Sequence, residues 1–280
     1  MMSILGVNKL KINFIATILQ HLENKISFNQ VLNHWITRQG QRPENLVLII
    51  MSKSKNLIAE AMGTFIMVFA GTGAIAIDAL FGSIGLVGIA ITFGFVIVAL
   101  IYSFGHISGA HFNPAVTIAF WSIGEFSGKQ VLPYILSQAF GAIIASYLLL
   151  FLLSENFTTV GEAANLGATM PSGSIMQAFI FEFLLSFILM LVICSSAVHG
   201  MAIKDFAGIA IGFTVGLEAM FAGPITGASM NPARSIGPSL ASGQIDHLWI
   251  YIIATTFGMI VAAQVFLRFI KCKDPSECKL

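Results

Sequence analysis

The sequence predicts an all-α membrane protein with six transmembrane helices, two re-entrant half-helices and an inverted three-helix repeat. AVILMFWYC account for 56% of the 280 residues and DEKR for only 10%, against about 25% charged residues in soluble domains. The mean hydropathy is +0.87. So few charges cannot cover a water-facing surface. The sequence contains six long apolar stretches and two short ones, and each short one begins with Asn-Pro-Ala.

The long apolar stretches are predicted to be the membrane spans. A helix needs about 20 mostly apolar residues to cross a bilayer. The stretches that meet this length lie at about 57–79, 84–105, 130–154, 173–198, 206–222 and 247–270. The two short stretches, at about 113–122 and 231–241, are too short to span.

The distribution of basic residues predicts the orientation, because lysine and arginine favour the cytoplasmic side of a membrane. With six spans, all of the 14 basic residues except Arg234 fall on cytoplasmic segments when both termini are inside. Arg234 lies beside the second short stretch, where an ionisable side chain usually faces a watery cavity. The alternative is an arginine that snorkels to the outer surface.

Composition divides the chain into three parts. Residues 1–50 carry five of the basic residues and no apolar run long enough to span. They are expected to be a mobile cytoplasmic extension, or the result of an upstream start site, because Met51 reads as a natural start. Residues 51–270 form the membrane domain, and residues 271–280 a cytoplasmic tail. Within the membrane domain, repeat 1 covers about 57–154 and repeat 2 about 173–270.

The two short stretches begin at equivalent places of an internal repeat. Residues 108–117 (SGAHFNPAVT) and 226–235 (TGASMNPARS) are identical at five of ten positions. Three spans per unit is an odd number, so the second copy must cross the membrane in the opposite sense. Inverted repeats place their functional site near the midplane, where their discontinuous helices meet. Non-helical backbone at that depth is tolerated when it is buried or lines water, so we expect a lined cavity.

Each Asn-Pro-Ala is expected to start a half-helix near the bilayer centre. Asparagine is a good N-cap, and proline at the first helical position lacks an N–H that would be unpaired there. Two helix N-termini, each carrying roughly half a positive charge, repel cations from the point that they share. The asparagine amides can donate to a passing oxygen atom. The residues of this constriction are Asn113, Pro114, Ala115, Asn231, Pro232 and Ala233.

Other polar residues have a structural and a functional interpretation. Glu60 and Glu182 lie 53 and 49 residues before the two signature asparagines and are expected to bond to the re-entrant loops, with a proton relay as the alternative. Glu218 is expected either to line a vestibule or to bond to a neighbouring helix. His106 and His111 are expected to bond within their loop, with a pH gate as the alternative.

The remaining patterns point away from chemistry. Cys194, Cys272 and Cys278 show no zinc or redox spacing and are expected to be reduced thiols. No catalytic, cofactor or metal motif is found, and a net charge of +1 offers no basic face for a nucleic acid. A glycine at every fourth position of residues 208–216 is expected to let two helices approach closely.

Residues 106–117 and 223–235 resemble the two signatures of the aquaporins and glycerol facilitators, the major intrinsic protein family. The resemblance extends from about Asn56 to Phe269. It implies a right-handed six-helix bundle with one pore per subunit and a homotetramer. It also implies a multi-pass protein of the plasma membrane or the bacterial inner membrane, whose partners are the lipid bilayer, water and small neutral solutes.

In this family a selectivity filter is built from four positions, which by similarity fall on Phe93, Ala219, Ala228 and Arg234. Water-selective members usually carry histidine at the position of Ala219. Glycerol facilitators usually carry tryptophan at the position of Phe93 and an aromatic residue at that of Ala228. The set found here is most similar to that of the nodulin-like plant channels and their bacterial relatives, so the resemblance implies a wide filter.

The resemblance implies a passive channel for water and small uncharged solutes such as glycerol, without enzymatic activity. Protons and ions are expected to be excluded by the two half-helix N-termini and the filter arginine. One alternative is an ion-coupled secondary transporter, which can also be built from inverted repeats and which predicts uphill accumulation. The other is a structural junction protein that keeps the fold but barely conducts.

Overall fold

The computed structural model describes residues 43–156, 164–272 and 278, with residues 43–53 described by their backbone alone. The chain divides into two compact units, residues 1–54 and residues 55–280, and the second contains every predicted site residue. Most of the predicted extension lies outside the described residues.

The first described helix, α2 (Pro43–Phe81), begins inside the predicted extension rather than near residue 57. Proline is well tolerated at the start of a helix, and no glycine or proline follows it before Gly63. The part of α2 that is long and apolar enough to cross a membrane is Ser54–Phe81. The domain boundary after residue 50 stays a prediction.

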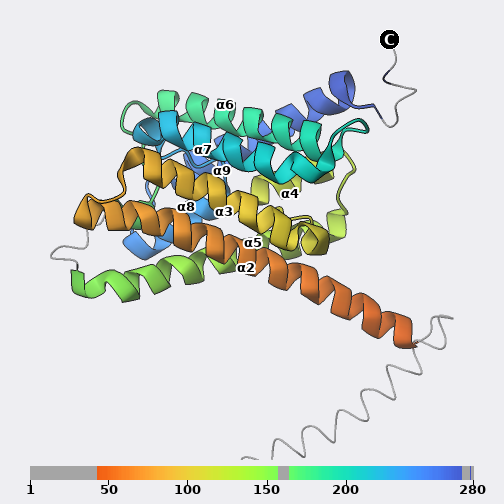
Figure 1. Cartoon of the computed structure of the whole chain (residues 1–280), viewed down its shortest axis with the longest axis horizontal. Coiled ribbons are helices and arrows are strands. Elements are labelled where there is room, and N and C mark those ends of the chain that lie inside the picture. The colour runs from red at the N-terminus through yellow and green to blue at the C-terminus, as the bar shows by residue number, and fades with distance from the viewer. Residues whose placement is uncertain (1–42, 157–163, 273–277, 279–280) are drawn as a thin grey trace, which may run out of the picture. The chain divides into compact units, whose positions relative to one another are not determined.

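The prediction of six long and two short helices is confirmed within the described residues. After α2, the long helices are α3 (Gly85–Ser108), α5 (Gly128–Leu153), α6 (Ile175–Ile193), α7 (Ala207–Thr226) and α9 (Leu248–Val265). The π-helical turns η3 (Cys194–Val198) and η5 (Phe266–Ile270) extend α6 and α9. The short helices are α4 (Pro114–Ser122) and α8 (Pro232–Ser242), which lie among the long ones (Figure 1).

The glycines allow the long helices to pack closely. A Cβ atom built on Gly94 of α3 would lie 2.8 Å from the Gly212 carbonyl oxygen and 3.2 Å from the Gly216 Cα of α7, and α3 and α7 lie side by side (Figure 1). The structural prediction for the glycine stripe is therefore confirmed at these two positions. A Cβ on Gly141 of α5 or on Gly258 of α9 would likewise collide with the backbone of the neighbouring helix.

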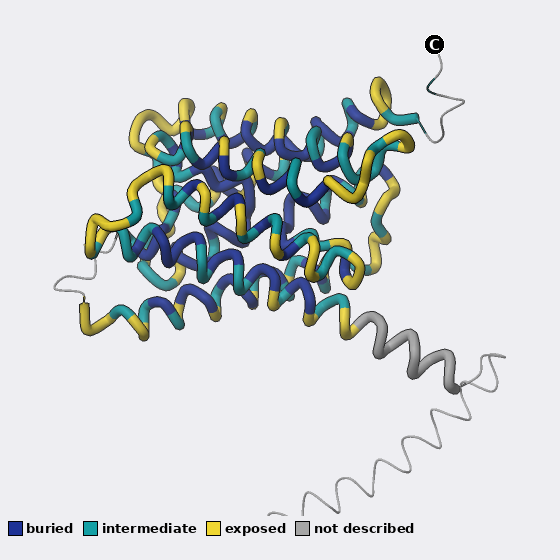
Figure 2. The backbone as a smooth tube through the Cα atoms, viewed as in Figure 1, coloured by how far each residue is buried: buried dark blue, intermediate teal, exposed yellow. Residues whose placement is uncertain are grey.

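The long helices have buried inner sides and exposed outer sides (Figure 2). Many of the exposed residues are large and apolar, including Phe95, Phe140, Phe151 and Phe213, which are each more than half exposed. A soluble monomer rarely presents so much contiguous apolar surface. Lipid tails are the environment that fits these faces.

Candidate functional site

A cavity of about 130 Å³ runs between the two re-entrant segments. Most of its wall is apolar, with side chains such as Ile97, Val116, Leu189 and Val215. Six of the predicted site residues line it: Phe93, Asn113, Ala219, Ala228, Asn231 and Arg234. The other four, Pro114, Ala115, Pro232 and Ala233, are buried in the first turns of α4 and α8.

Each asparagine caps its own half-helix and also binds the opposite repeat. The Asn113 Oδ1 accepts from the Ala115 N–H (2.9 Å), and its Nδ2 donates to the Met230 carbonyl oxygen (2.8 Å). The Asn231 Oδ1 accepts from the Ala233 N–H (2.9 Å), and its Nδ2 donates to the Phe112 carbonyl oxygen (2.9 Å). The Asn231 Nδ2 also donates to the Met67 Sδ (3.8 Å), a weak acceptor. Because an amide nitrogen has two hydrogens, Asn113 retains one donor beyond its bonds to the described residues.

The loops before the two half-helices have matching, unusual backbone angles. Ala110 and Phe112 have φ of 52° and 48°, and Ala228 and Met230 have φ of 43° and 54°. Residues other than glycine rarely adopt positive φ, at a cost of about 1–3 kcal/mol each. Such a loop needs strong contacts to hold it in place.

Two buried glutamates supply those contacts. The Glu60 carboxylate accepts from the N–H groups of His111 (3.0 Å) and Phe112 (2.7 Å). The Glu182 carboxylate accepts from the N–H groups of Ser229 (2.9 Å) and Met230 (3.0 Å). The loop hydrogen bonds predicted for both glutamates are therefore confirmed. Further side-chain donors complete both sets: Ser108 and Gln138 for Glu60, and Thr226 for Glu182.

Arg234 is buried, with 2% of its surface exposed, and lies in the cavity wall. Its Nη1 donates to the Gly167 carbonyl oxygen (2.6 Å), and its guanidinium carbon lies 5.1 Å from the centroid of the Phe93 ring. This distance is within cation–π range. The alternative prediction, an arginine snorkelling to the outer surface, is wrong, because α8 directs the side chain inward.

Sequence reasoning missed the segment that holds Arg234. Gly167 lies in the turn η2 (Ala164–Gly167), on the connection between α5 and α6. The same connection bonds to α8 through Thr169 and Ser235 (2.7 Å), and to the end of α7 through the Ser172 N–H and the Ile225 carbonyl oxygen (3.0 Å). Two of these three bonds use backbone atoms of the connection, which any residue type can provide, so the sequence does not reveal them. Gly167 has a positive φ of +74°, which glycine adopts readily, and the glycine was therefore the one sign of this turn in the sequence.

His111 and Glu218 differ in how well they were predicted. His111 lines the cavity, and its Nδ1 lies 3.0 Å from the Thr117 Oγ1, as the loop interpretation expects. That hydroxyl donates to the Asn113 carbonyl oxygen, so the His111 Nδ1 is the donor of the pair.

Glu218 is buried, but it is not part of the cavity wall, and neither carboxylate oxygen has a partner among the described residues. Both predictions for Glu218 are wrong.

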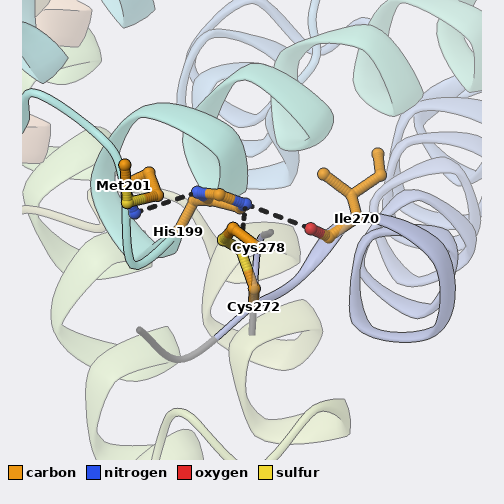
Figure 3. Close-up of a disulfide and its surroundings, with 5 residues drawn as sticks. All are labelled: His199, Met201, Ile270, Cys272 and Cys278. Carbon is orange, nitrogen blue, oxygen red and sulfur yellow. Dashed lines mark hydrogen bonds between the residues drawn. A yellow bond between two sulfur atoms is a disulfide. The ribbon is translucent and has the colours of Figure 1, made fainter. Parts of the chain in front are cut away.

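The expectation of three reduced thiols is also wrong. Cys272 and Cys278 form a disulfide beside His199 (Figure 3), whereas Cys194 is free and buried. The two Cα atoms lie 5.7 Å apart. This separation falls within the range that a disulfide requires, and the sequence spacing gave no sign of the bond.

The comparisons with known proteins agree with this geometry. The family model described as major intrinsic protein matches residues 48–266. Nodulin-26 of Glycine max is 44% identical over 227 residues, covering 81% of both chains. Aquaporin NIP1-2 of Arabidopsis thaliana is 43% identical over 229 residues, covering 81% of this chain and 78% of its own. The X-ray structure of the aquaglyceroporin from Plasmodium falciparum matches with a TM-score of 0.66 and 26% identity, covering 78% of this chain and 97% of that one.

Proposed function

We propose that this chain, which belongs to the major intrinsic protein family, passes water and small uncharged solutes such as glycerol through a wide filter formed by Phe93, Ala219, Ala228 and Arg234. Members of this family are passive channels and not enzymes, so the chain is a channel. The ion-coupled transporter considered from the sequence is not supported.

One observation carries the choice of solute. Arg234 is the one charged side chain among the described residues that line the cavity, and the residues beside it include two alanines, Ala219 and Ala228. A methyl group leaves more width than the histidine usual in water-selective members. Selectivity in such pores depends on the diameter and on the hydrogen-bond donors of the wall. A wide ring with one strong donor therefore suits a hydroxylated neutral molecule.

The mechanism follows from the donors along the cavity. A solute that leaves bulk water exchanges hydrogen bonds with the guanidinium of Arg234, then with the second amide hydrogen of Asn113 and with that of Asn231, which it takes over from the weak Met67 Sδ acceptor. The intervening wall is apolar, so the solute binds weakly and is released quickly. Cations meet the buried arginine and two positive helix ends, and the low-dielectric wall strengthens that repulsion.

The surroundings of the channel belong to the same proposal. The basic residues favour a cytoplasmic location for both termini, in the plasma membrane or the bacterial inner membrane. The exposed apolar faces of the long helices can contact both lipid and neighbouring copies, which supports a homotetramer with one pore in each subunit.

Stopped-flow light scattering on proteoliposomes tests the proposal. We expect the wild type to conduct water and glycerol, and Ala219→His to lose glycerol conductance while it keeps water conductance. Ala219→Leu is the matched control, because it adds comparable bulk without a polar group. If the wild type conducts water but excludes glycerol, the proposed filter is wrong and another residue narrows the cavity.

A further inference from the structure

The segment after α9 folds back onto the connection between α6 and α7. The Gly200 N–H donates to the Cys272 carbonyl oxygen (3.1 Å), and the His199 ring lies edge-on to Phe266, with 6.3 Å between ring centroids. Cys272 is in turn bonded to Cys278. His199 and both cysteines are half-buried, so small molecules can reach them.

The hydrogen bonds of His199 determine which of its nitrogens carries the proton. The Met201 N–H donates to Nδ1 (3.1 Å), so Nδ1 presents a lone pair. The proton of the neutral ring is therefore on Nε2. That nitrogen lies 3.1 Å from the Ile270 carbonyl oxygen and 3.1 Å from the Cys272 Sγ (Figure 3). The single Nε2–H is therefore shared between the Ile270 carbonyl oxygen and the Cys272 sulfur.

The two sulfurs are consequently not equivalent. Among the described residues, the Cys272 sulfur has a ring N–H within hydrogen-bonding distance, and no such donor contacts the Cys278 sulfur. An N–H donor stabilises a thiolate more than a thiol or a disulfide sulfur, because the thiolate carries the charge. We propose that Cys272–Cys278 is a reversible thiol–disulfide exchange site for small thiols and their disulfides, with Cys272 as the reactive sulfur positioned by His199.

Reduction begins at Cys272. A small thiolate attacks the Cys272 Sγ, the Sγ–Sγ bond breaks, and its electron pair leaves on Cys278 as a thiolate. A second small thiolate then attacks the sulfur of the first one in the mixed disulfide with Cys272. This step releases the small-molecule disulfide and the Cys272 thiolate, which accepts from the His199 Nε2–H. Two small thiols are oxidised and the protein disulfide is reduced, so electrons balance.

Oxidation uses a small disulfide such as oxidised glutathione. The Cys272 thiolate attacks one of its sulfurs, forms a mixed disulfide and releases one small thiolate. The Cys278 thiolate then attacks the Cys272 Sγ and displaces the second small thiolate. Oxidation is thus the exact reverse of reduction, and Cys272 is the sulfur that forms the mixed disulfide in both directions.

A metal ion fits the same three residues less well. The His199 Nε2 and the two Sγ atoms lie within 4.8 Å of one another, a spacing that a soft cation could use in the dithiol state. However, a metal on Nε2 moves the ring proton to Nδ1. Two hydrogens would then face each other at the Met201 N–H. The hydrogen bond from Met201 therefore favours exchange chemistry over coordination.

The environment of the tail adds support, and this point rests on the proposed orientation. With both termini inside, the disulfide faces the reducing cytosol, where disulfides in mesophiles are usually transient and catalytic or redox-sensing. The exchange reaction itself depends only on the local geometry and can be measured without any permeability assay.

The first test uses the full chain, purified in detergent and reduced, with oxidised glutathione as the probe. Cys278→Ser leaves Cys272 as the reactive tail thiol, and Cys272→Ser leaves Cys278. We expect glutathione to add to Cys272 about threefold faster or more than to Cys278, as measured by peptide mass spectrometry. Buried Cys194 serves as an internal standard that should stay unmodified.

The second test asks whether His199 causes the difference. In the Cys278→Ser background, His199→Leu should reduce the rate at Cys272 to that of Cys278. His199→Gln, whose amide can donate, should retain part of the advantage. Equal rates at the two cysteines, no effect of His199→Leu, or a wild-type chain that forms no 272–278 disulfide with oxidised glutathione would overturn the proposal. None of these results depends on whether the channel conducts glycerol.

Discussion

Glu182→Gln should weaken the second re-entrant loop. In the wild type, Oε1 accepts from Thr226 and the Ser229 N–H, and Oε2 accepts from the Met230 N–H (3.0 Å). A glutamine that keeps its oxygen on the first pair places an NH₂ group against the Met230 N–H. One hydrogen bond to a charged group is lost, at about 1.5–3 kcal/mol, and a buried donor is left unpaired, at about 1–3 kcal/mol. The easier burial of a neutral amide offsets part of this, which leaves about 2–4 kcal/mol.

The loss should show in two measurements. The thermal unfolding midpoint in detergent should fall, and the water permeability of proteoliposomes should fall with it, because the loop carries Met230, the acceptor of Asn113. Ser186→Ala is the matched control. Ser186 lies one turn along α6 from Glu182 and is equally buried, and its hydroxyl has no partner among the described residues. A Glu182→Gln variant with the midpoint and permeability of Ser186→Ala would refute the reasoning.

Three further predictions follow from other parts of the structure. Gly212→Ala should lower the thermal unfolding midpoint, because the added Cβ would lie 2.6 Å from the Gly94 carbonyl oxygen. Gly223→Ala on the same helix is the control: its Cβ would have Leu86 as its nearest neighbour, at 3.5 Å, so the midpoint should stay unchanged. Asn113→Asp should keep the helix cap but turn the donor to Met230 into a second acceptor, so water permeability should fall and cation conductance in planar bilayers should rise; unchanged conductance would contradict the role of the helix ends. Glu218→Met should keep water permeability and raise the unfolding midpoint, because it removes a buried carboxyl group that has no partner among the described residues. A lower midpoint would contradict this reasoning.

The sequence was most informative where a residue type has a single physical use. Asparagine followed by proline is an N-cap followed by a first helical position, so the starts of α4 and α8 were predicted to within one residue. The six membrane spans were also predicted, with ends within a few residues of those in the structure, because a fixed bilayer thickness requires a fixed length of apolar helix. The start of α2 was predicted less well: Lys53 and Lys55 mark where the apolar span begins, but the helix itself continues back to Pro43.

Contacts that depend on tertiary geometry were not predictable. The partner of Arg234 is a backbone carbonyl at Gly167, and any residue type can offer a carbonyl oxygen. The disulfide required knowing that Cys272 and Cys278 lie close enough to bond. Glu218 was given two roles because its sequence neighbour, Ala219, faces the cavity, but a helix turns by 100° per residue and directs the two side chains differently.

The crossed bonds of the two asparagines have a consequence for synthesis. The chain leaves the ribosome from its N-terminus, so Asn113 and Phe112 enter the bilayer more than a hundred residues before Met230 and Asn231 exist. Until then, the amide of Asn113 and the carbonyl group of Phe112 lack their final partners, a state that costs several kcal/mol for each group in hydrocarbon. The contacts at the centre of the protein therefore form only after the second repeat has entered the bilayer. A nascent chain halted before residue 230 already contains five of the six long helices and still has no finished interior.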